Sequence, residues 1–111
     1  MKKRFRVKRN EEFQDIIQKG KSLASRAYVV YYYDSMSVTN DRVGISVGKK
    51  LGNAVERNKI KRQVRSMVMD ITDFSRGKDT IIIVRKGYCG RSYEDNKKEL
   101  LKLYEKVYNS L

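Results

Sequence analysis

A strongly basic stretch, from Lys49 to Arg65, carries the residues best suited to chemistry. It reads KKLGNAVERNKIKRQVR and holds seven cationic side chains and one acid in seventeen residues. Arg57 and Arg62 present planar forks of donors that match the oxygens of a phosphate, and the amide of Asn58 can hydrogen-bond a base edge or a 2′-hydroxyl. The stretch therefore predicts a surface that binds a polyanion, with nucleic acid as the first candidate.

The same stretch predicts a helix with two different long sides. Asn53 suits an N-cap, Glu56 can complete a capping box with it, and the helix is expected from Ala54 to about Ile71. At about 100° per residue, one arc is apolar and predicts the side facing the core, with Ile60, Val64, Met67, Val68 and Ile71 on it. The next arc is cationic and holds Asn58, Lys61, Arg62 and Arg65, with Arg57 at its boundary and Lys59 pointing elsewhere.

These cations favour a docking face over a merely solvated one. Most stand three or four residues apart with no acid between them, so they repel one another by a few tenths of a kcal/mol per pair. A solvated helix usually interleaves Glu with Lys and Arg. The basic helix alone does not distinguish RNA from DNA.

The overall composition indicates a folded, strongly cationic protein. Of the 111 residues, 26 are Lys or Arg and 13 are Asp or Glu, so the formal net charge is +13. A polyanionic partner would relieve the resulting repulsion. The hydrophobic content of 40% is too high for a disordered chain, and the length predicts a single domain over residues 1–111.

Several chemistries are disfavoured by the residues that the chain lacks. Cys89 is the one cysteine and there is no histidine, so neither an internal disulfide nor a zinc site is expected. The acids Glu11, Glu12, Glu94 and Asp95 fit the first turns of helices better than an acid–base pair, which argues against a nuclease acting by itself. No window approaches 18 apolar residues, so we expect a cytoplasmic protein that binds no membrane.

Segments on either side are expected to position the basic helix. Asn10 to Gly20 predicts a short helix with Phe13 and Ile17 on its apolar face. The runs RAYVVYYYD and RVGISVG, at 26–34 and 42–48, predict two strands, joined as a hairpin by a polar turn near Ser35 to Asp41.

The remainder of the chain predicts one more strand and a closing helix. DTIIIVR, at 79–85, lacks alternation and so predicts a strand covered on both faces. Ser92 to Leu111 has apolar residues at helical spacing, and Asp95 can complete a capping box with Ser92. The expected order is helix, strand, strand, helix, strand, helix.

The residues from Gly52 to Arg65 carry a resemblance to a known family. They read Gly-Asn-Ala-Val-x-Arg-Asn-x-x-Lys-Arg-x-x-Arg, which resembles the RNR signature of the protein subunit of bacterial ribonuclease P. The likeness continues through the basic amino terminus, the Phe-bearing helix, RAYVVY, RVGISVGKK and DTIIIVRK. One departure is Lys59, where the family often has Arg.

The resemblance implies a fold and an activity. The fold would be an α/β (α+β) two-layer sandwich of ribosomal-protein-like type, with a mixed sheet and a left-handed β-α-β crossover, whereas the general rule favours a right-handed one. The protein would be an accessory subunit of the ribonuclease P endoribonuclease. Its RNA subunit, with Mg²⁺, would hydrolyse the phosphodiester that joins precursor tRNA to its 5′ leader, and no side chain of this chain would be catalytic or bind the metal.

The resemblance also implies two binding sites. The ribonuclease P RNA would be bound by Lys49, Lys50, Arg57, Asn58, Lys59, Lys61, Arg62 and Arg65. A cleft between the first helix and the sheet would bind the 5′ leader of precursor tRNA through Phe13, Ile17 and Tyr31, with Asn58 and Arg62 at its edge. Ile17 replaces an aromatic residue common in the family, so it offers contact without a π-face.

Two expectations remain in competition at these positions. From the residues alone Phe13 is a core residue, whereas the resemblance predicts that Phe13 and Tyr31 are partly exposed.

The main functional alternative is a ribosomal or other structural RNA-binding protein with no role in cleavage. No small-molecule substrate is expected.

Overall fold

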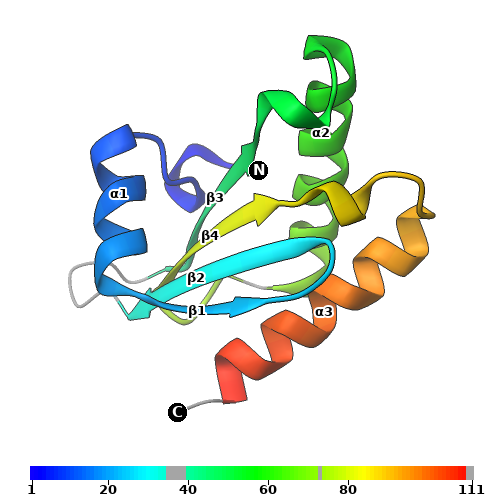
Figure 1. The fold of residues 1–111 in the computed structure, drawn as a ribbon. Coiled ribbons are helices and arrows are strands. Elements are labelled where there is room, and N and C mark those ends of the chain that lie inside the picture. The colour runs from blue at the N-terminus through cyan, green and yellow to red at the C-terminus, as the bar shows by residue number, and fades with distance from the viewer. Residues whose placement is uncertain (35–39, 73, 110–111) are drawn as a thin grey trace.

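The structure is a computed structural model of the chain, and it describes residues 1–34, 40–72 and 74–109. Figure 1 shows the order of elements along the chain. The helices are α1 Asn10–Lys19, α2 Ala54–Ile71 and α3 Tyr93–Asn109, and the strands are β1 Lys21–Ala24, β2 Tyr28–Asp34, β3 Arg42–Val47 and β4 Lys78–Val84. Short 3-10 turns are η1 Lys3–Phe5, η2 Lys49–Leu51 and η3 Lys86–Tyr88.

The strands form one mixed sheet in the order β1-β2-β4-β3. β2 is antiparallel to both of its neighbours, and β3 is parallel to β4, with α2 connecting the two parallel strands. The α+β class and the β-α-β unit through the basic helix are therefore confirmed. β1 was not predicted, because its four mostly exposed residues carry little pattern of their own and are ordered by pairing with β2.

The predicted hairpin between the second and third strands is wrong. β4 lies between β2 and β3 and pairs with both. Val84 of β4, for example, is paired with Tyr28 of β2 on one side and with Val47 of β3 on the other. A strand with six of its seven residues buried needs neighbours on both edges, and the central position supplies them. Residues 35–39 of the predicted turn lie outside the described residues.

The sheet has different helices on its two faces (Figure 1). Ile82 and Val84 of β4 pack in the large core together with α2 and α3, whereas Ile81 packs with Ile16 of α1 in a smaller cluster. Successive strand residues point to opposite faces, so the two clusters are separated by the sheet. α1 therefore lies on the face opposite to α2 and α3.

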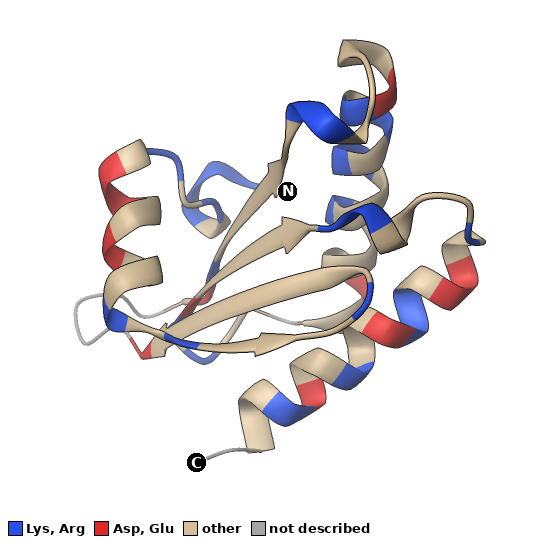
Figure 2. Cartoon of the chain, in the orientation of Figure 1, with Lys and Arg blue, Asp and Glu red and all other residues tan. Residues whose placement is uncertain are grey.

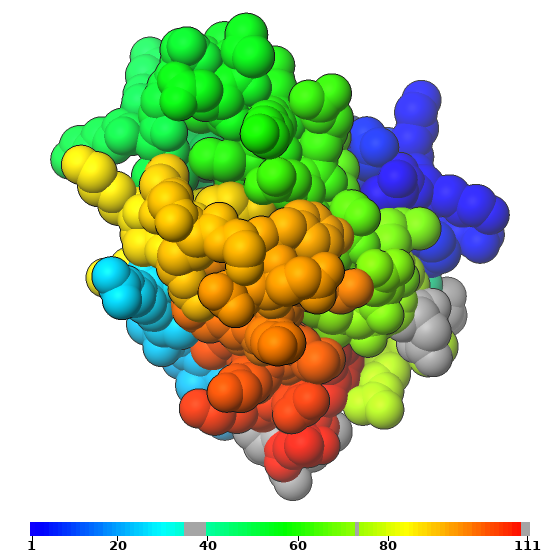
Figure 3. Space-filling model, turned by 90° about the vertical axis from the view of Figure 1, so that its right-hand side faces the viewer, coloured from blue at the N-terminus to red at the C-terminus, as the bar shows by residue number. Residues whose placement is uncertain are grey.

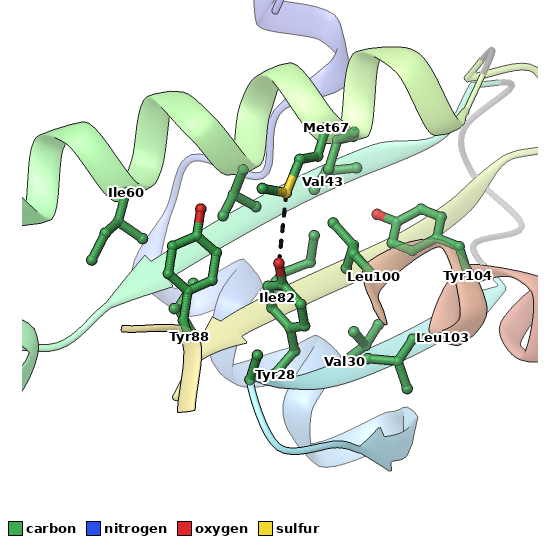
Figure 4. Close-up of a cluster of buried hydrophobic side chains, with 14 of the residues drawn as sticks. Tyr28, Val30, Val43, Ile60, Met67, Ile82, Tyr88, Leu100, Leu103 and Tyr104 are labelled. Atoms are coloured by element: carbon green, nitrogen blue, oxygen red, sulfur yellow. Dashed lines mark hydrogen bonds between the residues drawn. The ribbon is translucent and has the colours of Figure 1, made fainter. Parts of the chain in front are cut away.

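The large core confirms the apolar side predicted for α2. Ile60, Val64, Met67 and Val68 are buried, and Ile71 is partly buried. The side chains from α2, α3 and the sheet interlock around Tyr28, whose hydroxyl donates to the carbonyl oxygen of Asn96 at 2.9 Å and contacts Met67 Sδ at 3.6 Å (Figure 4). Each fully buried aliphatic side chain contributes about 1.5–3 kcal/mol, so this core holds α2 in a defined orientation.

The start of α2 has the predicted capping box. Asn53 Oδ1 accepts from the amide of Glu56 at 2.9 Å, and Glu56 Oε1 accepts from the amide of Asn53 at 3.1 Å. Gly52, with φ of 139°, turns the chain sharply into the helix. At α3, the amide of Asp95 donates to Ser92 Oγ at 3.1 Å, which confirms half of the pair expected there.

Candidate nucleic-acid interface

The cationic side of α2 is held open to the surroundings. Asn58, Lys59 and Arg62 are exposed, and Arg57, Lys61 and Arg65 are partly buried beside the apolar stripe. Within the described part of the chain, none of these five cations forms a salt bridge. Lys49 and Lys50, in η2 just before the helix, are also exposed.

The other side of α2 is fixed to η3 and α3 by polar contacts. Tyr88 donates its hydroxyl to Gln63 Oε1 at 2.7 Å, and Lys97 Nζ pairs with Asp70 at 2.9 Å. Figure 3 shows α2 and α3 packed side by side on this part of the surface. One side of α2 thus contacts α3 and another packs in the core, whereas Asn58, Lys59 and Arg62 on the cationic side are exposed.

The charges of the molecule are unevenly distributed (Figure 2). Only four of the 26 cations, Arg42, Lys78, Arg91 and Lys97, take part in salt bridges in the described residues. Acids are concentrated on α1 and α3, whereas α2 has a single acid, Glu56, before Asp70 near its end. The first half of α2 is therefore one of the places where positive charge is concentrated.

A second set of predicted residues meets on the opposite face of the sheet. Phe13 and Tyr31 are partly buried and pack against the cluster formed by Val7, Ile16 and Ile81. This agrees with the partial exposure expected for Phe13 and Tyr31. Ile17, on the same helix, is also partly buried.

Phe13 is seated on a glycine of β3. A Cβ built on Gly44 would lie 2.6 Å from Phe13 Cζ and 2.8 Å from Ile81 Cδ1, so only a residue without a side chain fits under the ring. The next row of the same face consists of Val29, Ile83 and Ser46, which are direct neighbours across β2, β4 and β3 and are partly exposed. Phe13 thus borders a partly open, mainly apolar surface.

The predicted leader-binding residues come from elements on both faces of the sheet. Asn58 and Arg62 lie on α2, which packs on the sheet face opposite to α1. Phe13, Ile17 and Tyr31 therefore share one face, and the two α2 residues belong to the cationic side of the other.

One polar cluster that the sequence did not indicate positions α1. Arg42 donates to Glu12 Oε2 at 2.6 Å and, through two nitrogens, to both carboxylate oxygens of Asp79 at 3.0 and 2.8 Å. The hydrogen bond from Arg42 lowers the pKa of Glu12 below its usual value, and the hydrogen bonds to Asp79 raise the pKa of Arg42. Since Glu12 precedes Phe13, this bridge fixes the start of α1 relative to β3 and β4. No spacing signal links three residues so far apart in sequence.

The described residues contain no group of three or more His, Cys, Asp or Glu side chains arranged to hold a metal ion. None of the described helices is long and apolar enough to cross a membrane. The candidate interface consists of two surfaces, the cationic side of α2 and the sheet face bordered by Phe13.

Comparisons with known proteins identify the family to which the chain belongs. The family model described as Ribonuclease P matches residues 1–108. The ribonuclease P protein component of Bacillus cereus strain B4264 is 48% identical over 107 residues, covering 96% of this chain and 93% of the relative. The corresponding protein of Bacillus anthracis strain CDC 684 is 47% identical, covering 96% of this chain and 90% of the relative.

Solved structures show the same fold. The RNase P protein of Staphylococcus aureus superposes with a TM-score of 0.86 at 38% identity, covering 93% of this chain and 94% of that one. The RNase P protein of Thermotoga maritima superposes with a TM-score of 0.77 at 30% identity, covering 88% and 93%. The chain is thus an α+β protein of the kind found as a subunit of ribonucleoproteins. It belongs to the ribonuclease P protein component family.

Proposed function

We propose that this chain binds the ribonuclease P RNA and the 5′ leader of precursor tRNA, and so assists the removal of the leader. The observation that carries the proposal is the cationic side of α2, which is held in place by the core and whose cations form no salt bridge with any described residue. A broader range of precursors would be cleaved when the protein is present, because the contacts it offers do not depend on leader sequence.

The RNA subunit is bound by the α2 side and the turn before it. The contact residues are Lys49, Lys50, Arg57, Asn58, Lys59, Lys61, Arg62 and Arg65. Their cations would neutralise backbone phosphates and release counterions. For about five phosphates, the logarithm of the affinity should fall with the logarithm of the salt concentration at a slope of about −3.5 to −4.5.

The leader is bound on the α1 face. Phe13 and Tyr31 offer aromatic surfaces for unpaired bases, and stacking of this kind contributes about 1–3 kcal/mol per base with little sequence preference. Ile17 adds apolar contact beside Phe13. Asn58 and Arg62 belong to α2, whose apolar side packs on the opposite face of the sheet; they contact the RNA subunit and border the leader site from that side.

The chemistry belongs to the RNA subunit, with Mg²⁺ bound mainly by that RNA. The contribution of this chain is binding energy and positioning, because it holds the leader and lowers the repulsion between RNA strands. Retention of the substrate in a productive orientation then favours precursor over mature tRNA.

Cleavage of a precursor tRNA by the Bacillus cereus ribonuclease P RNA at low Mg²⁺, with and without this chain, tests the proposal. We expect cleavage to be much faster with the protein and the difference to shrink at high Mg²⁺. Equal rates at low Mg²⁺ would contradict the proposal. Filter binding to ribosomal RNA tests the alternative. A structural ribosomal protein would bind ribosomal RNA more tightly than ribonuclease P RNA.

A further inference from the structure

The amino-terminal arm, residues 2–9, is a second concentration of positive charge that is built into the fold. Its six cations are Lys2, Lys3, Arg4, Arg6, Lys8 and Arg9, and none forms a salt bridge among the described residues. A charged terminus of this kind is usually disordered. Here the arm is tied to the molecule at several points.

The arm is anchored by its two apolar residues. The ring of Phe5 stacks on Phe74 at a centroid distance of 4.3 Å, and Val7 is buried at 5% exposure. The backbone is held as well. The amide of Val7 donates to the carbonyl oxygen of Val43 at 3.1 Å, and Arg6 and Val43 form an isolated parallel β-bridge. The backbone that carries the six cations is thus held in place.

The anchors place the arm across the edge of the sheet. Met1 and Phe5 pack against the large core on the α2 side, whereas Val7 belongs to the cluster on the α1 side. The bridge to Val43 lies between them, on β3, which is the last strand of the sheet. The arm therefore carries positive charge from the α2 side round the β3 edge, and Figure 3 shows it beside α2.

Five of the arm's cations line a hollow of about 530 Å³ together with Arg42 and the start of α1. Glu11, Glu12 and Asp15 also line the hollow, and among the residues that the structure describes only Glu12 of these three forms a salt bridge, with Arg42. A hollow of this size accepts a small ligand or a short stretch of one strand rather than a duplex. The three acids limit how far a polyanion can extend over α1.

We propose that the amino-terminal arm is a second phosphate-binding surface, which receives a single-stranded segment of the same RNA subunit that docks on α2. The inference rests on the proposed function, since it extends that docking face round the β3 edge. Because the backbone of the arm is already ordered, binding of phosphates costs less conformational freedom than it would for a flexible tail. The RNA backbone thus follows the arm from α2 to the hollow.

The test compares two triple variants with equal loss of charge. Lys3→Gln with Lys8→Gln and Arg9→Gln removes exposed cations of the arm while leaving Phe5 and Val7 in place. Lys98→Gln with Lys102→Gln and Lys106→Gln removes three exposed cations of α3 and serves as the control. Affinity for Bacillus cereus ribonuclease P RNA is measured over a range of salt concentrations, and thermal melts verify that each variant is folded.

We expect the arm variant to bind more weakly and its salt slope to become shallower by about 2, as three lost contacts to a single strand require. The control should keep the wild-type slope. Equal slopes in both variants would overturn the proposal. An Arg57→Gln, Arg62→Gln variant of α2 distinguishes failure of the proposed function from failure of the arm proposal. If this α2 variant binds the RNA normally, the proposed function is refuted. If the α2 variant binds weakly and the arm variant binds normally, only the arm proposal is refuted.

Discussion

The ring of Phe13 lies directly over the backbone of Gly44, so that a Cβ at position 44 would stand 2.6 Å from Phe13 Cζ. This contact sets how closely α1 approaches β3, and with it the position of the aromatic ring at the border of the partly open sheet face. The proposed leader site therefore depends on a residue that has no side chain.

Gly44→Ala should displace Phe13 and destabilise the fold by about 1–3 kcal/mol, the usual cost of overpacking. Urea unfolding measures the loss. Gly48→Ala is the matched control, because nothing lies within 4 Å of a Cβ there and φ is −73°. A Gly44→Ala protein as stable as the Gly48→Ala protein would show that the ring is not confined.

Changes at Phe13 and Ile17 should alter leader binding in opposite directions. Phe13→Leu keeps apolar volume but removes the π-face, so affinity for precursor tRNA should fall by about 1–2 kcal/mol. Ile17→Phe adds a ring and should strengthen it. The internal control is mature tRNA, which has no leader to stack; its binding to the assembled holoenzyme is measured in the same way. Equal effects on precursor and mature tRNA would refute stacking.

Arg62→Ala should weaken binding to the RNA subunit with little effect on folding. Arg62 is exposed and has no salt bridge in the described residues, so its loss should change the free energy of unfolding by less than about 0.5 kcal/mol. One lost charge-assisted contact should weaken RNA binding by about 1.5 kcal/mol, roughly tenfold. Unfolding of the variant in a thermal melt would assign Arg62 to the core instead.

The salt bridge between Glu12 and Arg42 predicts a pH dependence. The pKa of Glu12 is lowered in the folded protein, so its contribution is present above the unfolded pKa of about 4.3 and is lost as the pH falls through the lower folded value. Glu12→Gln should cost about 0.5–1 kcal/mol at pH 7, and the difference from wild type should shrink towards pH 3. Urea titrations at both pH values measure it.

Glu11→Gln provides the comparison for that experiment, since Glu11 is exposed and forms no salt bridge in the described residues. Its effect at pH 7 should be smaller than that of Glu12→Gln. If both variants lose the same stability, or if the Glu12→Gln difference persists at pH 3, the bridge does not hold α1 in place.

Tyr28→Phe should destabilise the core by about 1–3 kcal/mol. Tyr28 is fully buried, and removing its hydroxyl leaves the carbonyl oxygen of Asn96, 2.9 Å away, without this donor. Tyr33→Phe, at the exposed end of the same strand, is the control and should be nearly neutral in urea unfolding. Equal stabilities would mean that the hydroxyl adds nothing to the attachment of α3.

The sequence by itself determined the features that arise within one segment. The capping box of Asn53 and Glu56, the apolar side of α2 and its neighbouring cationic side all follow from helical periodicity over a few turns. The run of isoleucines in β4 likewise predicted a strand covered on both faces, although not its place in the sheet. Local spacing is sufficient there because the interacting residues are three or four positions apart.

The tertiary structure alone decided which distant segments meet. It placed β4 between β2 and β3, ordered β1, seated Phe13 on Gly44 and joined Glu12, Arg42 and Asp79. It also put α1, which carries Phe13, and α2, which carries Arg62, on opposite faces of the sheet. These outcomes depend on burying apolar faces from all parts of the chain at once, and no local pattern encodes that choice of partner.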